Sequence, residues 1–234
     1  MADPLGDLRP GHYHSDPPTG HDTRPLRYTP VMRLLLATHN AHKVDEIRAI
    51  LASAGDAMAG VEVVGLDAYP DVPEAPEDHD TFVDNAIQKA RFVHARTGVA
   101  CVADDSGLEV DALGGAPGVR SKRYTPEATA ASNNAKLLRE LAGRTDRTAR
   151  FRCVLALVTD RGVWTADGAC EGRIGAAPAG RGGFGYDPLF LPDDHPGRAM
   201  AELQPDEKNR ISHRGRAFAQ LPDLLAAARR SHDS

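Results

Sequence analysis

The stretch Val99-Ala100-Cys101-Val102-Ala103-Asp104-Asp105-Ser106-Gly107 decides the fold, because an apolar run passes directly into two adjacent acidic residues. A short continuous apolar run is typical of a strand that is covered on both faces of a sheet. We therefore expect a strand that ends at the acidic pair. Two neighbouring carboxylates repel each other, so they persist where a hard cation or a proton separates their charges. The pattern predicts a Mg²⁺ site at the end of this strand, suited to a ligand that carries phosphates.

The residues before this stretch alternate between strand and helix patterns. Behind Asn40, a residue type that caps helices well, apolar residues recur with the helical period. The segment 81–84 resembles a capping box with Asp in place of Glu or Gln. In chain order the pattern predicts a strand at 34–37, a helix from Asn40 to near Gly55, a strand at 61–64, an acidic and proline-rich loop at 66–80, and a helix from Thr81 to Gly98.

The residues after the stretch contain more strands than helices. In chain order the pattern predicts a helix opened by Thr125 and Pro126 and running to Leu141, antiparallel strands at 150–158 and 162–170, and a helix capped by Ser212 that Pro222 should break or kink. Strands therefore alternate with helices first and cluster later. This order predicts an α/β fold with a mixed sheet rather than a purely parallel one.

The composition excludes several classes of protein. The chain has 234 residues, of which 41% are hydrophobic and 26% charged, ordinary proportions for a globular protein. Its net charge of -5 argues against a nucleic-acid binder, which usually carries a basic excess. The longest apolar runs, such as 154–158, are far too short to cross a bilayer, and the N-terminus lacks the apolar core of a signal peptide. We expect neither nucleic-acid nor membrane partners.

The cysteines and the N-terminal segment indicate location and domain organisation. Cys101, Cys153 and Cys170 are widely spaced without a C-x-x-C pair, which predicts buried, reduced thiols and a cytoplasmic location. Residues 1–31 are rich in Pro, Gly, His and Asp without a hydrophobic period, so we expect a disordered extension there. Residues 32–234 would then form one folded domain.

Two segments offer a positive counterpart to the acidic pair. Thr38-His39-Asn40-Ala41-His42-Lys43 joins a strand to a helix, whose first amide groups and Lys43 would favour an anion. The segment lacks the glycines of a Walker or dinucleotide-binding loop, and a capped helix with a surface lysine is the alternative. Lys89 lies on the helix that follows the acidic loop. Glu77 in that loop could reach a cation at the acidic pair, and the alternative is a solvated acidic loop.

Two later segments would suit a nucleobase. The segment 180–188 is glycine-dense and contains Phe184 and Tyr186. Glycine allows close backbone approach and an aromatic ring can stack on a base, while a glycine hairpin with core aromatics is the alternative. The segment 207–215 gathers cations at a helix start, where the helix dipole disfavours them. A surface charge run is the default interpretation, but a placement against the dipole invites an anionic or carbonyl-bearing ligand as its reason.

Five segments, taken in their order along the chain, resemble the inosine triphosphate pyrophosphatase family. They are 37–43 (ATHNAHK), 81–90 (TFVDNAIQKA), 103–118 (ADDSGLEVDALGGAPG), 183–188 (GFGYDP) and 207–215 (EKNRISHRG). The resemblance covers essentially all of 32–234. It implies hydrolysis of the non-standard purine nucleotides ITP, dITP and XTP to the monophosphate and pyrophosphate with Mg²⁺. It also implies a homodimer and an elongated mixed sheet with flanking helices, in two lobes with the active-site cleft between them.

The resemblance further implies roles for single residues. Thr38, Asn40 and Lys43 would hold phosphates, with Lys89 facing them. Glu77 and Asp105 would bind Mg²⁺, and Asp105 would also accept the proton of the attacking water. The residues that would surround the nucleoside are Ser106, Phe184, Gly185, Tyr186, Asp187, Lys208, His213 and Arg214. The chain carries His39 where that family usually has glycine.

Other interpretations of these patterns stay open at the level of sequence. A phosphohydrolase could cleave the β–γ bond and release orthophosphate, and a nucleotide sensor could bind without turnover. The acidic pair by itself is compatible with a tight turn, which accounts for one acid and not for two. In an enzyme, a donor such as Arg214 would satisfy the O6 acceptor of hypoxanthine or xanthine and clash with the amine of adenine. The same donor would not reject guanine, which also has O6.

Overall fold

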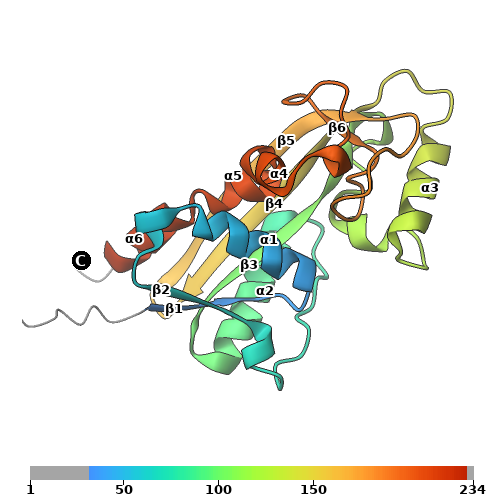
Figure 1. Ribbon diagram of the computed structural model, residues 1–234. Coiled ribbons are helices and arrows are strands. Elements are labelled where there is room, and N and C mark those ends of the chain that lie inside the picture. Colours follow the sequence, from blue (N-terminus) through green and yellow to red (C-terminus); the bar gives the residue numbers. More distant parts are fainter. Residues whose placement is uncertain (1–31, 231–234) are drawn as a thin grey trace, which may run out of the picture. The chain divides into compact units, whose positions relative to one another are not determined.

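The computed structural model describes residues 32–230, and the predicted extension at 1–31 lies outside the described residues. The described chain forms a six-stranded sheet in the order β2-β1-β3-β4-β5-β6 (Figure 1). The strands are β1 (Met32–Leu36), β2 (Val61–Gly65), β3 (Ala100–Val110), β4 (Thr148–Thr159), β5 (Gly162–Ile174) and β6 (Phe190–Pro192). β1 pairs in parallel with β2 and β3, and the β3-β4-β5-β6 pairs are antiparallel. The predicted mixed α/β sheet is confirmed.

Helices connect these strands. The α-helices are α1 (Ala41–Ala52), α2 (Phe82–Thr97), α3 (Ala130–Glu140), α4 (Pro205–Ile211), α5 (His213–Phe218) and α6 (Leu221–Arg230). The 3₁₀ helices are η1 (Gly55–Met58), η2 (Leu66–Ala68), η3 (Asp111–Leu113), η4 (Gly118–Arg123) and η5 (Met200–Glu202). Between residues 32 and 230, no helix combines the length and the apolar character that a membrane crossing requires.

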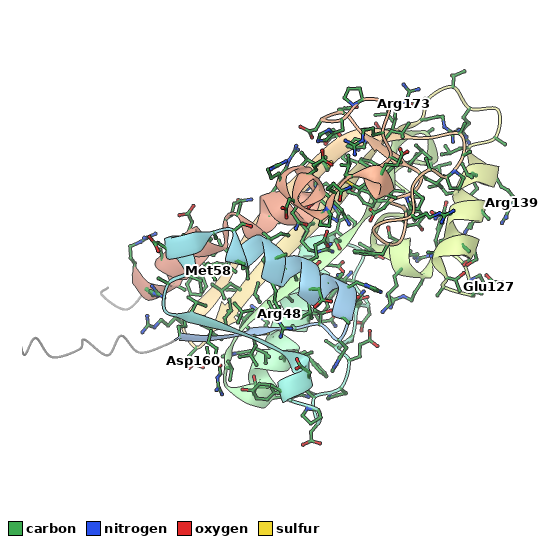
Figure 2. All side chains as sticks on the ribbon, in the orientation of Figure 1. Arg48, Met58, Glu127, Arg139, Asp160 and Arg173 are labelled. Carbon is green, nitrogen blue, oxygen red and sulfur yellow. The ribbon has the colours of Figure 1, made fainter. Side chains whose placement is uncertain are left out.

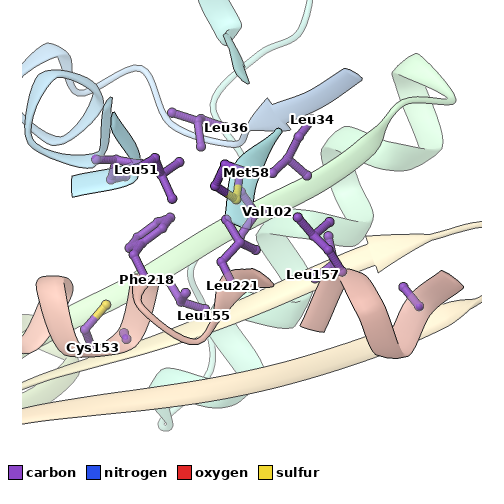
Figure 3. Close-up of a cluster of buried hydrophobic side chains, with 14 residues drawn as sticks. Leu34, Leu36, Leu51, Met58, Val102, Cys153, Leu155, Leu157, Phe218 and Leu221 are labelled. Carbon is purple, nitrogen blue, oxygen red and sulfur yellow. The ribbon is translucent and has the colours of Figure 1, made fainter. Parts of the chain in front are cut away.

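The helices cover the two faces of the sheet (Figure 1). α1, α5 and α6 pack on one face, where Leu34, Leu36 and Phe218 lie in one buried cluster (Figure 3). α2 packs on the opposite face, in a second cluster that includes Leu35. Successive residues of a strand point to opposite faces, which explains why Leu35 and its two neighbours belong to different clusters.

The long strands β3, β4 and β5 extend beyond these helices into a second half of the sheet. There α3 and β6 contribute to a third buried cluster that contains Leu137, Phe151 and Phe190. In Figure 2, Glu127 and Arg139 are labelled at α3, whereas Asp160 lies at the opposite end, in the turn between β4 and β5. The two predicted lobes are therefore two halves of one continuous sheet.

The strand that carries the acidic pair does not end there. β3 continues through Asp104 and Asp105 to Val110, so the prediction of a strand end at the pair is wrong. The reason is the antiparallel neighbour β4, which pairs with β3 along its whole length, including Asp104↔Leu155 and Asp105↔Val154. The parallel neighbour β1 stops pairing at Leu36↔Val102. The acids thus lie just past the carboxyl end of β1 but inside β3.

Local capping rules account for most helix ends. Asn40 caps α1 by accepting from the amide of Lys43, and Thr81 caps α2 as predicted. The predicted capping box is wrong in one detail, because the Thr81 hydroxyl donates to the Asp84 carboxylate at 2.5 Å and no reciprocal bond reaches the Thr81 amide within the described residues. The helix capped by Ser212, α5, ends at Phe218 before Pro222, which lies in the first turn of the next helix, α6.

The start of α3 differs from the prediction. The helix begins at Ala130 with Thr129 as its cap, and not at Thr125. Thr129 and Ser132 bond each other's backbone amides, a reciprocal cap that Thr125 does not have in this chain. The Thr125 side chain instead bonds Asn133 at 2.9 Å, and Ala128 has a φ of 51°, which interrupts any helix before Thr129.

The three cysteines are free and buried, as the sequence predicts. Cys153 lies inside β4, where its Sγ is 4.0 Å from Asp104 Oδ2. Burial raises the pKa of all three thiols, which keeps them protonated.

A glycine on β5 permits close packing of α5. A Cβ at Gly168 would lie 2.3 Å from the His213 carbonyl oxygen and 2.5 Å from the Ala217 amide nitrogen. We expect Gly168→Ala to lower the free energy of unfolding by about 1–3 kcal/mol, because backbone atoms of α5 must shift. Urea unfolding measures this. The control is Gly175→Ala, whose Cβ would be 3.4 Å from its nearest neighbour, the Leu189 carbonyl oxygen. Equal stability of the two variants would contradict the close packing.

Candidate functional site

Two cavities lie side by side at the point where β1 stops pairing with β3. The first has a volume of about 430 Å³ and the second about 280 Å³. Predicted site residues that line the first are Asn40, Lys43, Glu77, Asp105, Ser106, Phe184, Gly185, Tyr186, Asp187, Lys208, His213 and Arg214. Thr38 and Lys89 line the second cavity, together with Asn40, Lys43 and Glu77. The structure therefore brings all the predicted site residues to two adjoining cavities, which we call the large and the small cavity.

The N-terminus of α1 forms part of the wall between the two cavities. Asn40 and Lys43 line both of them. The Thr38 hydroxyl accepts from the Asn40 amide at 3.2 Å, which shapes the turn between β1 and α1. The His39 ring nitrogen Nε2 lies 3.2 Å from the Val72 carbonyl oxygen, so this residue joins the turn to the acidic loop. Amide groups at a helix N-terminus favour an anion, and they border the cavities here.

Two carboxylates converge on one ammonium group between the cavities. Lys89 Nζ donates to Glu77 Oε1 at 2.9 Å and to Asp105 Oδ1 at 2.8 Å. Burial raises the pKa of Asp105 above its usual range, although the Lys89 charge opposes this. Burial alone would also raise the pKa of Glu77, but the Lys89 charge outweighs it and that pKa is lowered. The acidic loop and β3 thus present two carboxylate oxygens to the ammonium group of Lys89.

Asp104 points to the opposite face of the sheet from Asp105. Its Oδ2 accepts from Lys43 Nζ at 3.0 Å and from Arg214 Nη2 at 3.1 Å, and its side chain is 1% exposed. Burial would raise its pKa, but the charges of Lys43 and Arg214 outweigh this and hold the pKa of Asp104 far below its usual range. The pleat therefore separates the two acids, which do not share one cation.

The glycine-rich segment is held at three points along the large cavity. Asp187 Oδ2 accepts from the Phe184 amide at 2.8 Å, which closes a tight turn. The Tyr186 hydroxyl donates to the Ser121 carbonyl oxygen at 2.9 Å, and Asn134 donates to the Gly185 carbonyl oxygen at 3.0 Å. These bonds fix the Phe184 ring at the cavity wall.

The cations of the C-terminal segment come from two helices rather than from one helix start. Lys208 lies in α4 and Arg214 in the first turn of α5. Glu46 of α1 lies between them and forms ion pairs with both. Sequence reasoning missed Glu46, because its burial depends on α4 and α5. The one local signal is its spacing of three residues from Lys43, which puts both side chains on one helix face.

His213 is a buried, neutral residue in the wall of the large cavity. Its ring stacks on Phe151, with centroids 4.8 Å apart and an interplanar angle of 18°. Burial, with the charges of Arg214 and Lys208, holds the pKa of His213 well below its usual value. Its Nδ1 has no hydrogen-bond partner among residues 32–230. The ring is therefore an uncharged part of the cavity wall with one buried nitrogen that has no partner in the described chain.

Removal of the Asp104 charge should destabilise the fold. In Asp104→Asn, Lys43 and Arg214 lose their shared buried carboxylate, so we expect a loss of about 3–5 kcal/mol at pH 7. The folded pKa of Asp104 is depressed, so its contribution is present above the unfolded pKa of about 3.9 and is lost as the pH falls toward the folded pKa. Urea unfolding at pH 7 and below pH 4 measures both effects.

The control for this experiment is Asp111→Asn. Asp111 pairs with Arg150 near the surface, with a side chain that is 40% exposed, so its loss should cost about 1 kcal/mol or less. An Asp104→Asn protein as stable as this control at pH 7 would contradict the role given to the Asp104 pair.

Comparison with known proteins gives a consistent result. A family model described as the Ham1 family matches residues 34–224. A protein of Nocardia farcinica named dITP/XTP pyrophosphatase is 51% identical over 199 residues, which cover 83% of this chain and 95% of that protein. A protein of Porphyromonas gingivalis with the same name is 46% identical over 199 residues, covering 84% of this chain and 99% of that protein.

Solved structures are similar to this fold as well. A HAM1 protein from Coxiella burnetii has a TM-score of 0.74 and 40% identity, covering 84% of this chain and 99% of that one. A nucleoside-triphosphatase, also named dITP/XTP pyrophosphatase, from Mycobacterium abscessus has a TM-score of 0.65 and 45% identity, covering 83% of this chain and all (100%) of that one.

Proposed function

The chain belongs to the Ham1 family, and from that premise we propose that it hydrolyses the non-standard purine nucleotides ITP, dITP and XTP to the monophosphate and pyrophosphate. Such an enzyme would remove these nucleotides from the cellular pool. The names of the relatives support the reaction. The observation that carries the proposal is the pair of adjoining cavities, one lined by aromatic and hydrogen-bonding groups and the other by lysines and carboxylates.

The cavities would hold different parts of the substrate. The large cavity offers Phe184 for stacking on a base and Lys208 as a donor. The small cavity offers the ammonium groups of Lys43 and Lys89 to phosphate oxygens. The N-terminus of α1 lies between them, where its amide groups would face the first phosphate.

Glu77 and Asp105 fit a divalent cation, and we propose Mg²⁺. Their oxygens already converge on one cation, the ammonium of Lys89. Mg²⁺ usually binds through one or two carboxylates, with water and substrate phosphates as its other ligands. Two carboxylates match this usual number of protein ligands. Residues 32–230 contain no group of three or more His, Cys, Asp or Glu arranged for a metal. When bound, the metal would neutralise phosphate charge and polarise the scissile bond.

Asp105 would act as the proton acceptor. A water that attacks the α-phosphorus must lose a proton while the α–β anhydride bond breaks. Burial raises the pKa of Asp105, which makes this carboxylate a better base than an exposed aspartate. Lys43 and Lys89 would stabilise the charge of the departing pyrophosphate.

Recognition of the base would depend on the few donors that the site leaves free. Arg214, the donor predicted to reach O6, already donates to Asp104 at 3.1 Å and to Ser106 at 2.9 Å, and also to Glu46. Few of its five N–H groups thus remain for a ligand. Hypoxanthine and xanthine carry acceptor oxygens where adenine carries an amine, so the remaining donors would favour them.

The remaining parts of the proposal concern assembly and location. We infer a homodimer from the family resemblance, with 32–234 as the catalytic domain. Three buried, free thiols support a reducing, cytoplasmic location.

A panel of nucleotides with Mg²⁺ tests the reaction. We expect turnover of ITP, dITP and XTP to the monophosphate and pyrophosphate, with ATP slower by roughly 10⁴-fold because its amine mismatches the donors. Enzymatic assay of pyrophosphate and orthophosphate measures both products. Release of orthophosphate from ITP would indicate cleavage of the β–γ bond, and tight binding of ITP without any product would indicate a sensor.

Asp105→Asn tests the proton acceptor. The amide cannot take a proton, so kcat should fall by about 10²- to 10⁴-fold. Asp111→Asn, on the surface and away from both cavities, should keep the wild-type rate. Circular dichroism and thermal unfolding would establish that both variants fold. A folded Asp105→Asn enzyme with a near-normal kcat would refute the assignment.

A further inference from the structure

Glu46 lies behind the two cations that line the large cavity. Its Oε1 is 3.2 Å from Lys208 Nζ, and its Oε2 accepts from Arg214 Nη1. Its side chain is only 9% exposed, although it comes from the second turn of α1. A buried carboxylate that pairs with two cations is costly to place unless both pairs are kept.

Glu46 is not part of the wall that would face the nucleoside. Lys208 and Arg214 line the large cavity, whereas Glu46 lines a neighbouring groove, which shares Lys208 and Phe184 with the large cavity. Any effect of Glu46 on a ligand in the large cavity must therefore pass through the two cations.

Existing contacts limit the number of donors that each cation can offer. Lys208 has three N–H groups, of which it donates one to Asp187, while Glu46 Oε1 forms an ion pair with its ammonium at 3.2 Å without a hydrogen bond. Arg214 has five, and its contacts with Asp104, Ser106 and Glu46 leave one N–H on Nη1. Arg214 is thus left with one free N–H, and Lys208 with two, while Glu46 lies against both charged groups. Both cations line the large cavity, so a ligand there would be the acceptor for their free N–H groups.

We propose that Glu46 is a positioning residue for base recognition, which aims free N–H groups of Lys208 and Arg214 at the carbonyl oxygens of a purine base. The inference rests on the proposed function, because it assumes that the base occupies the large cavity. It identifies the group that makes the site prefer 6-oxo purines over adenine.

Glu46→Gln keeps the size of the side chain but changes its hydrogen bonding. The new amide NH₂ is a donor and must face either the ammonium or the guanidinium, both of which are donors only. That cation would turn away, and its free N–H would no longer be aimed at O6. We expect the ratio of kcat/KM for ITP to that for ATP to fall by about 10- to 100-fold, the size of one misplaced charged hydrogen bond.

The matched control is Asp45→Asn. Asp45 is the preceding residue on α1, is exposed and lines the same groove, so the change removes the same charge without touching either cation. This variant should keep the wild-type ratio. Glu46→Asp keeps the charge but shortens its reach, and it should give an intermediate ratio. If Glu46→Gln does not fold, the comparison of Glu46→Asp with Asp45→Asn decides.

Binding of IMP and AMP, measured by calorimetry, separates this inference from the proposed reaction. Wild-type protein that prefers IMP but does not hydrolyse ITP would refute the reaction, and the effect of Glu46→Gln on the IMP preference would still test the positioning role. A folded Glu46→Gln protein with unchanged base preference would overturn the inference, even if its activity with ITP and ATP fell equally. Equal binding of IMP and AMP by the wild type would also overturn it.

Discussion

The structure depends on a buried carboxylate, Asp104, that must remain paired. An unpaired charge at this depth would cost several kcal/mol, so the fold has to bring cations to it. Lys43 comes from the first turn of α1 and Arg214 from the first turn of α5, two helices far apart in the sequence. The same pairs therefore fix the position of both helix starts against β3, and residues of both helix starts line the large cavity.

The pleat of β3 gives two adjacent acids different tasks. Asp104 faces α1 and α5 and stabilises the arrangement of cations, while Asp105 faces α2 and meets Lys89 and Glu77. A turn at the same place would have left both side chains near each other. A continuous strand instead separates their charges across the sheet, so each acid is paired with different cations.

Sequence reasoning was most successful where the physics is local. Caps such as Asn40 and Thr81 follow from side-chain bonds to the nearest amides. The site residues were predicted from the family resemblance instead, and all of them line the two cavities. The strand end at the acidic pair was predicted wrongly, because the partner that extends β3 is β4, about fifty residues further along the chain. Glu46 was missed for a related reason, since only the packing of α4 and α5 buries it. The roles of the site residues remain predictions.

The burial of the cysteines has a practical consequence. A thiol reacts as its thiolate, and burial raises the pKa of Cys170 to about 12 and those of the other two thiols further. Cys153 also lies beside Asp104, whose negative charge disfavours a second anion. The described chain thus carries three probes that alkylating reagents reach only when the sheet opens. The rate of their modification would report how often the packed layers open and expose the buried thiols, because the closed native structure protects them from the reagent.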